Sequence, residues 1–192
     1  MRRVSKAEAL ADMAARGFQR TETGCVMCDL ARRRDGAEED ALRIREDEHA
    51  VVVLDRYAST RGHLLVIVRR HVERTTNLSL ATHLEVQRLV FEANLALDRL
   101  FAPRRIYTAT LGSPSATASA PPAMSFPHLH VHVLPIYEDG EGARPAAVFS
   151  WSSNVWLYDE GEAEQIAADL REVWPSVEAV EAVEAVEAVE KD

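Results

Sequence analysis

The stretch that most constrains the fold spans residues 126–135 and reads Phe-Pro-His-Leu-His-Val-His-Val-Leu-Pro. Its three histidines, His128, His130 and His132, alternate with aliphatic residues. Because side chains alternate faces along a strand, a strand here would put all three imidazoles on one face and the aliphatic chains into a core. Neighbouring imidazoles would then lie roughly 6.6 Å apart, close enough for two of them to contact one phosphate group.

Three explanations of this histidine strand are open: phosphate binding, metal binding and a purely structural role. A single histidine on a strand is usually a surface residue or a satisfied polar residue. Three on one face are harder to explain in that way, because each buried imidazole needs a hydrogen-bond or charge partner. Metal binding alone also explains a histidine-rich strand. A purely structural role is the least expected of the three.

Composition limits the partners that the chain can have. With 192 residues, 47% hydrophobic and 28% charged, we expect one globular domain with a substantial core. No apolar run approaches the ~20 residues needed to cross a bilayer, and none follows Arg2 and Arg3 as in a secretion signal, so we expect a cytoplasmic protein without a membrane partner. The net charge of −9 argues against nucleic acid as a partner but leaves room for a small anionic substrate.

Hydrophobic periodicity and turn residues predict mixed helices and strands. The long helix is expected to carry an apolar stripe of Leu80, Leu84, Phe91 and Leu95, widened by Val86, Val90, Leu97 and Phe101. A tail of Val-Glu-Ala repeats has no continuous apolar face, because a period of three drifts around a 3.6-residue helix. We predict helices at 6–16, 28–34, 79–101 and from an Asp159 cap to 174; strands at 49–55, 63–68, 105–111 and within 148–158; and loops at 57–62, 112–122 and 140–145.

The two cysteines, Cys25 and Cys28, are spaced Cys-Val-Met-Cys. One such pair in a cytoplasmic chain suggests metal ligation or redox chemistry more than a structural disulfide. Two ordinary core cysteines remain an alternative at this point.

The stretch from His128 to Leu134 matches the motif of the histidine triad superfamily, His-apolar-His-apolar-His followed by two apolar residues. The chain resembles this family further in its cysteine pair, in residues 46–55 and in residues 61–71. The resemblance implies an α+β fold with an antiparallel sheet of about five strands and a long helix. We therefore expect an N-terminal helical extension (1–24), a histidine triad domain (25–137), a C-terminal strand and helix extension (138–175) and an acidic low-complexity tail (176–192).

The resemblance also implies the roles of the site residues. The middle histidine, His130, is the family's nucleophile, which attacks the α-phosphorus of a nucleotide and forms a covalent nucleotidyl-histidine. His132 would contact the phosphate and His63 would support the triad. Asp55 matches the acidic residue that holds the ribose hydroxyls, and Ser125 could donate to phosphate.

Zinc-containing bacterial members of the family have four ligands whose counterparts here are Cys25, Cys28, His71 and His128. A Cys2His2 set suits a closed, tetrahedral structural zinc. Such a zinc would attach the amino-terminal segment to the sheet beside the catalytic residues. Family members commonly form homodimers, and we expect the same of this chain.

Two departures from the family pattern concern the substrate. Leu111-Gly112 stands where an Asn-Gly is usual, and Ala123-Met124-Ser125 replaces a Gly-Gln-Ser segment, so two hydrogen-bonding side chains are lost. The triad ends in histidine and not glutamine, which argues against the galactose-phosphate uridylyltransferase branch, and low basic content argues against the DNA-repair deadenylase branch.

The leading hypothesis is a nucleotide hydrolase or transferase acting at the α-phosphate, with a purine nucleoside phosphoramidate or a similar compound as substrate. Alternatives are a dinucleoside polyphosphate hydrolase or phosphorylase, and a non-catalytic nucleotide-binding protein on the same fold. A metal-handling protein is a weaker alternative, because the four zinc ligands would be saturated.

Overall fold

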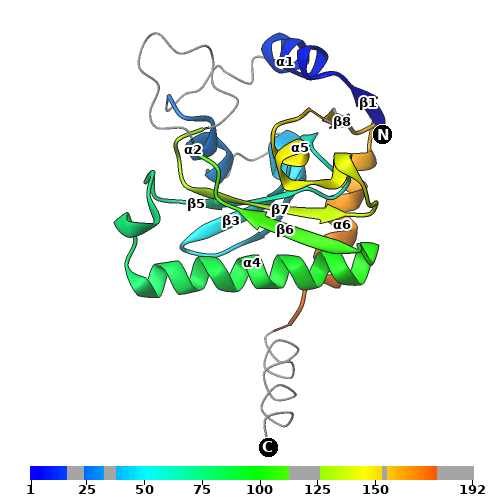
Figure 1. Cartoon of the computed structure of the whole chain (residues 1–192). Coiled ribbons are helices and arrows are strands. Elements are labelled where there is room, and N and C mark those ends of the chain that lie inside the picture. The colour runs from blue at the N-terminus through cyan, green and yellow to red at the C-terminus, as the bar shows by residue number, and fades with distance from the viewer. Residues whose placement is uncertain (17–23, 33–37, 113–125, 153–154, 177–192) are drawn as a thin grey trace, which may run out of the picture.

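The computed structural model describes residues 1–16, 24–32, 38–112, 126–152 and 155–176. Its main feature is a five-stranded antiparallel sheet with the strand order β2-β3-β5-β7-β6 (Figure 1). This sheet and a long helix confirm the expected α+β fold. The strands are β2 (Arg43–Glu46), β3 (Ala50–Leu54), β5 (Leu64–Val68), β6 (Arg105–Ala109) and β7 (His130–Ile136).

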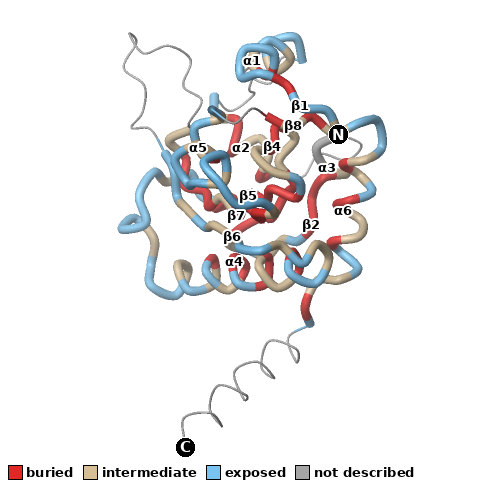
Figure 2. The backbone as a smooth tube through the Cα atoms, turned by 45° about the vertical axis from the view of Figure 1, so that its right-hand side comes forward, coloured by how far each residue is buried: buried red, intermediate tan, exposed pale blue. Residues whose placement is uncertain are grey.

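The central strands β3 and β5 are buried on both faces, as their β-branched and aliphatic sequences predict (Figure 2). One face of the sheet packs on α4 (Leu80–Phe101) and α6 (Glu162–Val173). The opposite face packs on the short helix α2 (Val26–Ala31), and Figure 1 shows α4 and α2 on opposite sides of the sheet. Facing α4 and α6 are Val52, Leu54, Leu64, Val66 and Val68; facing α2 are Val51, Val53, Leu65 and Ile67.

A second, three-stranded sheet joins the two ends of the described chain. Its order is β1-β8-β4, with β1 (Arg2–Val4), β8 (Val155–Leu157) and β4 (Tyr57–Ala58). The predicted loop at 57–62 is therefore wrong at its start, because Tyr57 and Ala58 pair with β8, a partner that sequence periodicity does not reveal. Helix α1 (Lys6–Ala15) follows β1 and begins with the capping box of Ser5 and Glu8.

Several predicted boundaries need correction. Strand β7 begins at His130, so His128 lies ahead of the strand, where it contacts Val68 at the end of β5. Helix α2 begins at Val26, two residues earlier than predicted. The strand predicted within 148–158 is confirmed by β8 (Val155–Leu157), which a short helix, α5 (Pro145–Phe149), precedes; α6 is capped by Gly161 in place of Asp159. Elements that the sequence did not predict are β1, β2, α3 (Glu38–Ala41), η1 (Thr75–Asn77) and η2 (Glu141–Ala143).

The predicted apolar stripe of α4 is confirmed for Val86, Val90 and Leu97, which are buried, and is wrong in the residues placed at its centre. Leu80, Leu84 and Phe91 are 72%, 56% and 41% exposed. The sheet-facing side of the helix contains small residues, which let the helix approach the strands closely and which a count of large apolar side chains overlooks. That buried side consists of Val86, Leu89, Val90, Glu92, Ala93, Ala96 and Leu97. No helix among the described residues is long and apolar enough to cross a membrane.

Candidate functional site

Two of the three triad imidazoles lie on the α2 side of the sheet. Val131 and Val133 face the α4 core, so His130 and His132 alternate to the other side. His63, at the start of β5, lies on the same side, because β5 and β7 pair in register with Leu65 opposite His132. The sequence-predicted grouping of these imidazoles on one face is therefore observed, apart from His128.

Glycine is required immediately before His63. Gly62 has a φ of 81°, in the left-handed region that favours glycine. A Cβ atom at this position would lie 2.7 Å from Cε2 of Phe101. The Gly62 amide donates to the Tyr158 hydroxyl at 3.2 Å. The turn that presents His63 to the triad is thus tightly packed.

The imidazoles form a continuous hydrogen-bonded chain. Nε2 of His63 lies 2.9 Å from Nδ1 of His132, and Nε2 of His132 lies 3.1 Å from Nε2 of His130. Nδ1 of His130 lies 2.7 Å from the carbonyl oxygen of His128. A carbonyl only accepts, so the proton of neutral His130 is on Nδ1 and Nε2 carries a lone pair. The nitrogen that faces His132 is therefore the nucleophilic one.

The protons along the rest of the chain follow from that assignment. His132 must donate from Nε2 to the lone pair of His130, which leaves Nδ1 of His132 to accept from Nε2 of His63. Nδ1 of His63 then accepts, in agreement with the Ser59 amide that donates to it at 3.3 Å. Burial, reinforced by neighbouring imidazoles, lowers the pKa of His63 well below its usual value and that of His132 to about 3. Burial also lowers the pKa of His130. All three rings are neutral near pH 7.

Asp55 lies at the far end of this chain. Its Oδ2 is 3.2 Å from Nδ1 of His63, and its Oδ1 accepts from the Tyr57 amide at 3.0 Å. Burial raises the pKa of Asp55 to about 7, against a weaker opposing effect of the Tyr57 amide. A protonated Asp55 can donate to the lone pair that the tautomer of His63 leaves on Nδ1. Asp55 also borders the substrate-sized cavity described below.

The second cluster consists of Cys25, Cys28, His71 and His128, whose ligand atoms lie within 4.8 Å of one another. Nδ1 of His128 is 3.5 Å from Sγ of Cys25 and 3.3 Å from Sγ of Cys28. Nδ1 of His71 is 3.2 Å from Sγ of Cys28. A tetrahedral zinc with Zn–S near 2.3 Å and Zn–N near 2.0 Å separates sulfur and nitrogen by about 3.5 Å. The cluster therefore fits a metal ion of this size, and it could bind one.

The backbone also prepares His128 for a metal. Its Nε2 lies 2.6 Å from the carbonyl oxygen of Val68, which places the ring proton on Nε2 and leaves Nδ1 free. Burial together with the neighbouring Cys25 raises the pKa of the Cys28 thiol to about 11. A bound cation reverses this preference, because it stabilises the thiolate. Metal binding here would release protons from the thiols.

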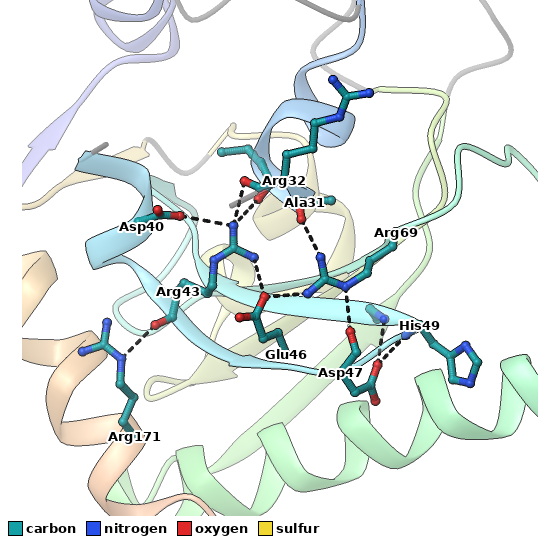
Figure 3. Close-up of polar contacts among 11 residues, drawn as sticks. Ala31, Arg32, Asp40, Arg43, Glu46, Asp47, His49, Arg69 and Arg171 are labelled. Carbon is teal, nitrogen blue, oxygen red and sulfur yellow. Dashed lines mark hydrogen bonds and ion pairs between the residues drawn. The ribbon is translucent and has the colours of Figure 1, made fainter. Parts of the chain in front are cut away.

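Two arginines hold the C-terminal end of the cysteine-bearing helix α2 (Figure 3). Arg43 donates to the carbonyl oxygens of Leu30 and Arg32 at 3.1 and 2.9 Å, and Arg69 donates to that of Ala31 at 2.9 Å. Glu46 lies between the two guanidinium groups and accepts from both. These bonds satisfy carbonyls that a helix end leaves unpaired, and they attach α2 to β2 and to the end of β5.

A cavity of about 260 Å³ opens beside the triad. His63, His130 and His132 border it, together with Asp55 and Leu111. Much of its remaining wall is apolar and comes from α2 and the sheet. Residues of α1, the last residue of α5 and the turn after it also line the cavity. His130, whose unprotonated Nε2 accepts from His132, therefore borders a space in which a small molecule can bind.

The structure thus brings together eight of the nine residues predicted for the site, in two clusters; Ser125 lies outside the described residues. Sequence reasoning missed Arg43, Arg69 and Phe149. The ring of Phe149 lies 6.0 Å from that of His132, edge to face. A signal for Arg43 was available, since a charged residue beside an apolar run requires a partner once that run is buried.

Comparisons with known proteins give one consistent family. A family model described as HIT domain matches residues 36–139. An uncharacterized HIT-like protein of Mycoplasma genitalium is 26% identical over 123 residues, covering 64% of this chain and 79% of that protein. Protein hit of Bacillus subtilis is 25% identical over 146 residues, covering 76% and 91%. A zinc-bound histidine triad family protein of Mycobacterium smegmatis is similar in fold, with a TM-score of 0.54 and 21% identity over 80% of this chain and 94% of that one.

Proposed function

The chain belongs to the HIT domain family of nucleotide-binding hydrolases and transferases, and we propose on this premise that it cleaves nucleotides at the α-phosphate through a covalent nucleotidyl-His130. The leading substrate is a purine nucleoside phosphoramidate or a similar compound. The observation that carries this proposal is the bond from Nδ1 of His130 to the His128 carbonyl, which leaves Nε2 unprotonated at the cavity. A neutral imidazole whose unprotonated nitrogen lies beside a cavity is a competent nucleophile once the His132 proton turns from it to the phosphate.

The proposed reaction has two displacements. Nε2 of His130 bonds to the α-phosphorus while the bond from phosphorus to the leaving group breaks, and the leaving group departs with the electron pair. Water then attacks the same phosphorus, the P–N bond breaks, and Nε2 of His130 recovers its lone pair. The attacking water loses its proton to solvent, which also supplies the proton that a departing amine takes up in the first step, and the nucleoside monophosphate is released.

His132 and His63 support this sequence by supplying a hydrogen-bond donor. The Nε2 proton of His132, which in the free protein points at the lone pair of His130, becomes available to a phosphate oxygen once His130 bonds to phosphorus. His63 holds His132 in the tautomer that this role needs. Asp55 would fix the tautomer of His63, in addition to the ribose contact that the family resemblance implies.

For the second cluster we propose a structural zinc held by Cys25, Cys28, His71 and His128. Two thiolates and two imidazoles form a closed donor set of the kind that holds zinc in structural sites, with no open position for a substrate. When bound, the ion supplies cross-linking and no step of the reaction. His128 connects the two clusters, since its side chain faces the cysteines and its carbonyl accepts from His130.

The remaining proposals concern the molecule as a whole. We propose a histidine triad domain at 25–137 with an N-terminal helical extension, a C-terminal strand and helix extension and an acidic tail, and a homodimer in the cytoplasm. Light scattering on the purified chain tests the dimer: a mass of about twice 21.4 kDa is expected, and a monomer over the working concentration range would contradict it.

The decisive experiment is detection of the covalent intermediate by intact mass. Zinc-loaded wild type, His130→Ala and His83→Ala would each be mixed with adenosine 5′-phosphoramidate and with diadenosine tetraphosphate, then quenched early at alkaline pH. His83 lies on α4, on the other side of the sheet, and serves as the matched control. We expect an adenylyl adduct in wild type and His83→Ala and none in His130→Ala. Tight nucleotide binding with neither adduct nor turnover would favour a non-catalytic nucleotide-binding protein.

A further inference from the structure

The cavity beside the triad has a buried apolar depth and an exposed polar rim. Met27, Val53 and Leu65 line its depth and are buried. Lys6 and Ser150 line it as well, but both are exposed and so lie at its opening. At about 260 Å³ the cavity is somewhat smaller than typical drug-sized sites, so it can enclose about one nucleoside, and the rest of a larger substrate would lie at the rim.

The rim is built by segments that lie outside the matched HIT domain at 36–139. Lys6 and Met13 come from α1, and Phe149, Ser150 and Trp151 come from α5 and the turn after it. The three-stranded sheet fixes both segments to the domain, because β1 and β4 pair with β8. The Tyr57 hydroxyl donates to Asp12 of α1 at 2.9 Å, which adds a tie between α1 and the strand after Asp55.

Trp151 occupies a strained position on this rim. Its φ of 58° lies in the left-handed region, which is costly for a bulky side chain. The ring is held against the cluster of Val4, Ala9 and Tyr57 that joins α1 to the three-stranded sheet. Backbone strain of this kind persists where surrounding structure over-determines it, and it is concentrated at functional sites.

The charge of the rim is opposite to that of the whole chain. Lys6 and Arg56 line the cavity, and the only carboxyl group among the described lining residues is that of Asp55, whose pKa is raised to about 7. The chain as a whole carries a net charge of −9. Lys6 is also the first residue of α1, where the helix dipole disfavours a cation, so it does not serve the stability of that helix.

We infer that this rim is the leaving-group site of the enzyme, where Lys6 and Trp151 bind a leaving group that is both anionic and aromatic, such as a nucleoside polyphosphate. The inference rests on the proposed function, with the transferred nucleotide in the apolar depth, and between the two substrate classes it favours a dinucleoside polyphosphate over the phosphoramidate. When Nε2 of His130 bonds to the α-phosphorus, the P–O bond breaks and the leaving group takes the electron pair. The ammonium of Lys6 stabilises that new negative charge, and the indole of Trp151 stacks on the base.

The test compares two substrates that transfer the same adenylyl group. Diadenosine tetraphosphate releases a nucleoside triphosphate, whereas adenosine 5′-phosphoramidate releases only ammonia. For Lys6→Ala we expect the ratio of kcat/KM for the tetraphosphate to that for the phosphoramidate to fall about tenfold or more, as expected for the loss of a charge-assisted hydrogen bond. Trp151→Gly removes the ring while accepting the positive φ, and loss of base stacking should lower the same ratio about tenfold.

Two controls separate the rim from general effects. Trp156→Phe changes a tryptophan on β8 that contacts Arg3 and does not line the cavity, so the ratio should not move. Lys6→Arg keeps the charge and should restore most of the ratio. An unchanged ratio in both Lys6→Ala and Trp151→Gly would overturn the inference while leaving the proposed function intact.

A binding measurement keeps the inference testable if catalysis itself fails. If wild type forms no adduct with either substrate, the proposed function is wrong, and the dissociation constant of diadenosine tetraphosphate for His130→Ala is then measured with and without Lys6→Ala. A weakening of about tenfold supports the rim as a polyphosphate site. Equal dissociation constants overturn it.

Discussion

The two clusters use the same side chain in opposite ways, and the contrast is sharpest between His128 and His130. His128 bonds Nε2 to the Val68 carbonyl and presents Nδ1 to the cysteines. His130 donates from Nδ1 to the His128 carbonyl and keeps Nε2 unprotonated beside the cavity, where it accepts from His132. In each ring a backbone carbonyl takes the proton-bearing nitrogen, so the backbone decides which nitrogen is free. One free nitrogen is suited to a metal and the other to phosphorus.

Loss of one cluster would mainly affect stability, whereas loss of the other would mainly affect the reaction. The cysteine cluster joins three separate segments of the chain, so its bonds would contribute to stability. The triad chain runs within the sheet and its entry turn, where packing already holds the backbone, so its loss would affect the reaction more than the fold. The following predictions test this division, and the largest expected effect comes first.

The largest effect is expected for His130→Ala on the reaction. Removing a nucleophile leaves only binding and electrostatic contributions, so kcat/KM should fall by about 10⁴-fold or more. The melting temperature of the zinc-loaded variant should stay within a few degrees of wild type. The measurement is steady-state kinetics alongside thermal unfolding; residual activity within about tenfold of wild type would assign the nucleophile elsewhere.

Metal removal, in contrast to His130→Ala, should lower the stability of the fold. A chelator applied to wild type should lower the free energy of unfolding by several kcal/mol, on the order of 4 if free zinc had been about a thousandfold above its dissociation constant. Cys28→Ser should show that loss without chelator and little further change with it. Unfolding in urea with and without chelator provides the comparison, and His130→Ala should respond to chelator as wild type does. Equal stability of wild type in both conditions would contradict a structural metal.

Asp55 gives a pH-dependent test of the triad chain. The pKa of Asp55 is about 7 in the folded chain and has an ordinary value of 3.8, so between these values the folded state keeps a proton that the unfolded state has lost. Wild-type stability therefore falls as pH rises across this window, relative to a chain without the group. The free energy of unfolding of Asp55→Asn minus that of wild type should rise from pH 4 to pH 7 by on the order of 3 kcal/mol and then level off.

Subtracting the two curves cancels the contribution of the buried histidines, which both chains share. Asp139→Asn is the matched control for the substitution itself, because Asp139 is exposed in an ion pair with Arg104 and does not line the cavity. An amide can also donate to Nδ1 of His63, so Asp55→Asn should keep adduct formation whereas Asp55→Leu should lose it. A flat difference curve for Asp55→Asn would mean that this carboxyl is ionised throughout the window.

Sequence patterns predicted which residues belong to the two clusters better than they predicted how those residues are arranged. Alternation along 126–135 predicts imidazoles on one face, because the period of a strand is two, and β7 confirms this for His130 and His132. The sequence does not predict the tautomers of these histidines, because they depend on backbone carbonyls, such as that of Val68, which strand pairing brings close. The fold class followed from the family resemblance.

The errors in the fold have identifiable causes. The stripe of α4 was misplaced because small residues, Ala93 and Ala96, carry the closest packing and have little weight in a hydrophobic pattern. Strand β4 was taken as a loop because its two residues pair only with β8, which lies far away in the sequence. Both depend on contacts between distant segments, which a local pattern does not contain.

The smallest effect is expected at the arginines that hold α2, and the quantity that should change is the affinity for zinc. Arg69→Met removes a guanidinium that donates to the Ala31 carbonyl and to Glu46, so the C-terminal end of the cysteine helix would lose part of its attachment. Since such supporting bonds orient ligands, zinc affinity should fall about 10–100-fold, measured by competition with a chromophoric chelator. Arg70→Met is a matched control, because Arg70 is exposed and donates to the Asn77 carbonyl instead.

Arg69→Lys separates charge from geometry at this position. A lysine keeps the positive charge but cannot reach Ala31, Glu46 and the Asp47 carbonyl together, as the planar guanidinium does (Figure 3). We therefore expect Arg69→Lys to bind zinc more weakly than wild type and more tightly than Arg69→Met. Wild-type affinity in Arg69→Met would show that α2 is held by its apolar contacts alone. The cysteines would then be positioned as His130 is, by packing on the sheet, and the contrast between the two clusters would narrow to their tautomers.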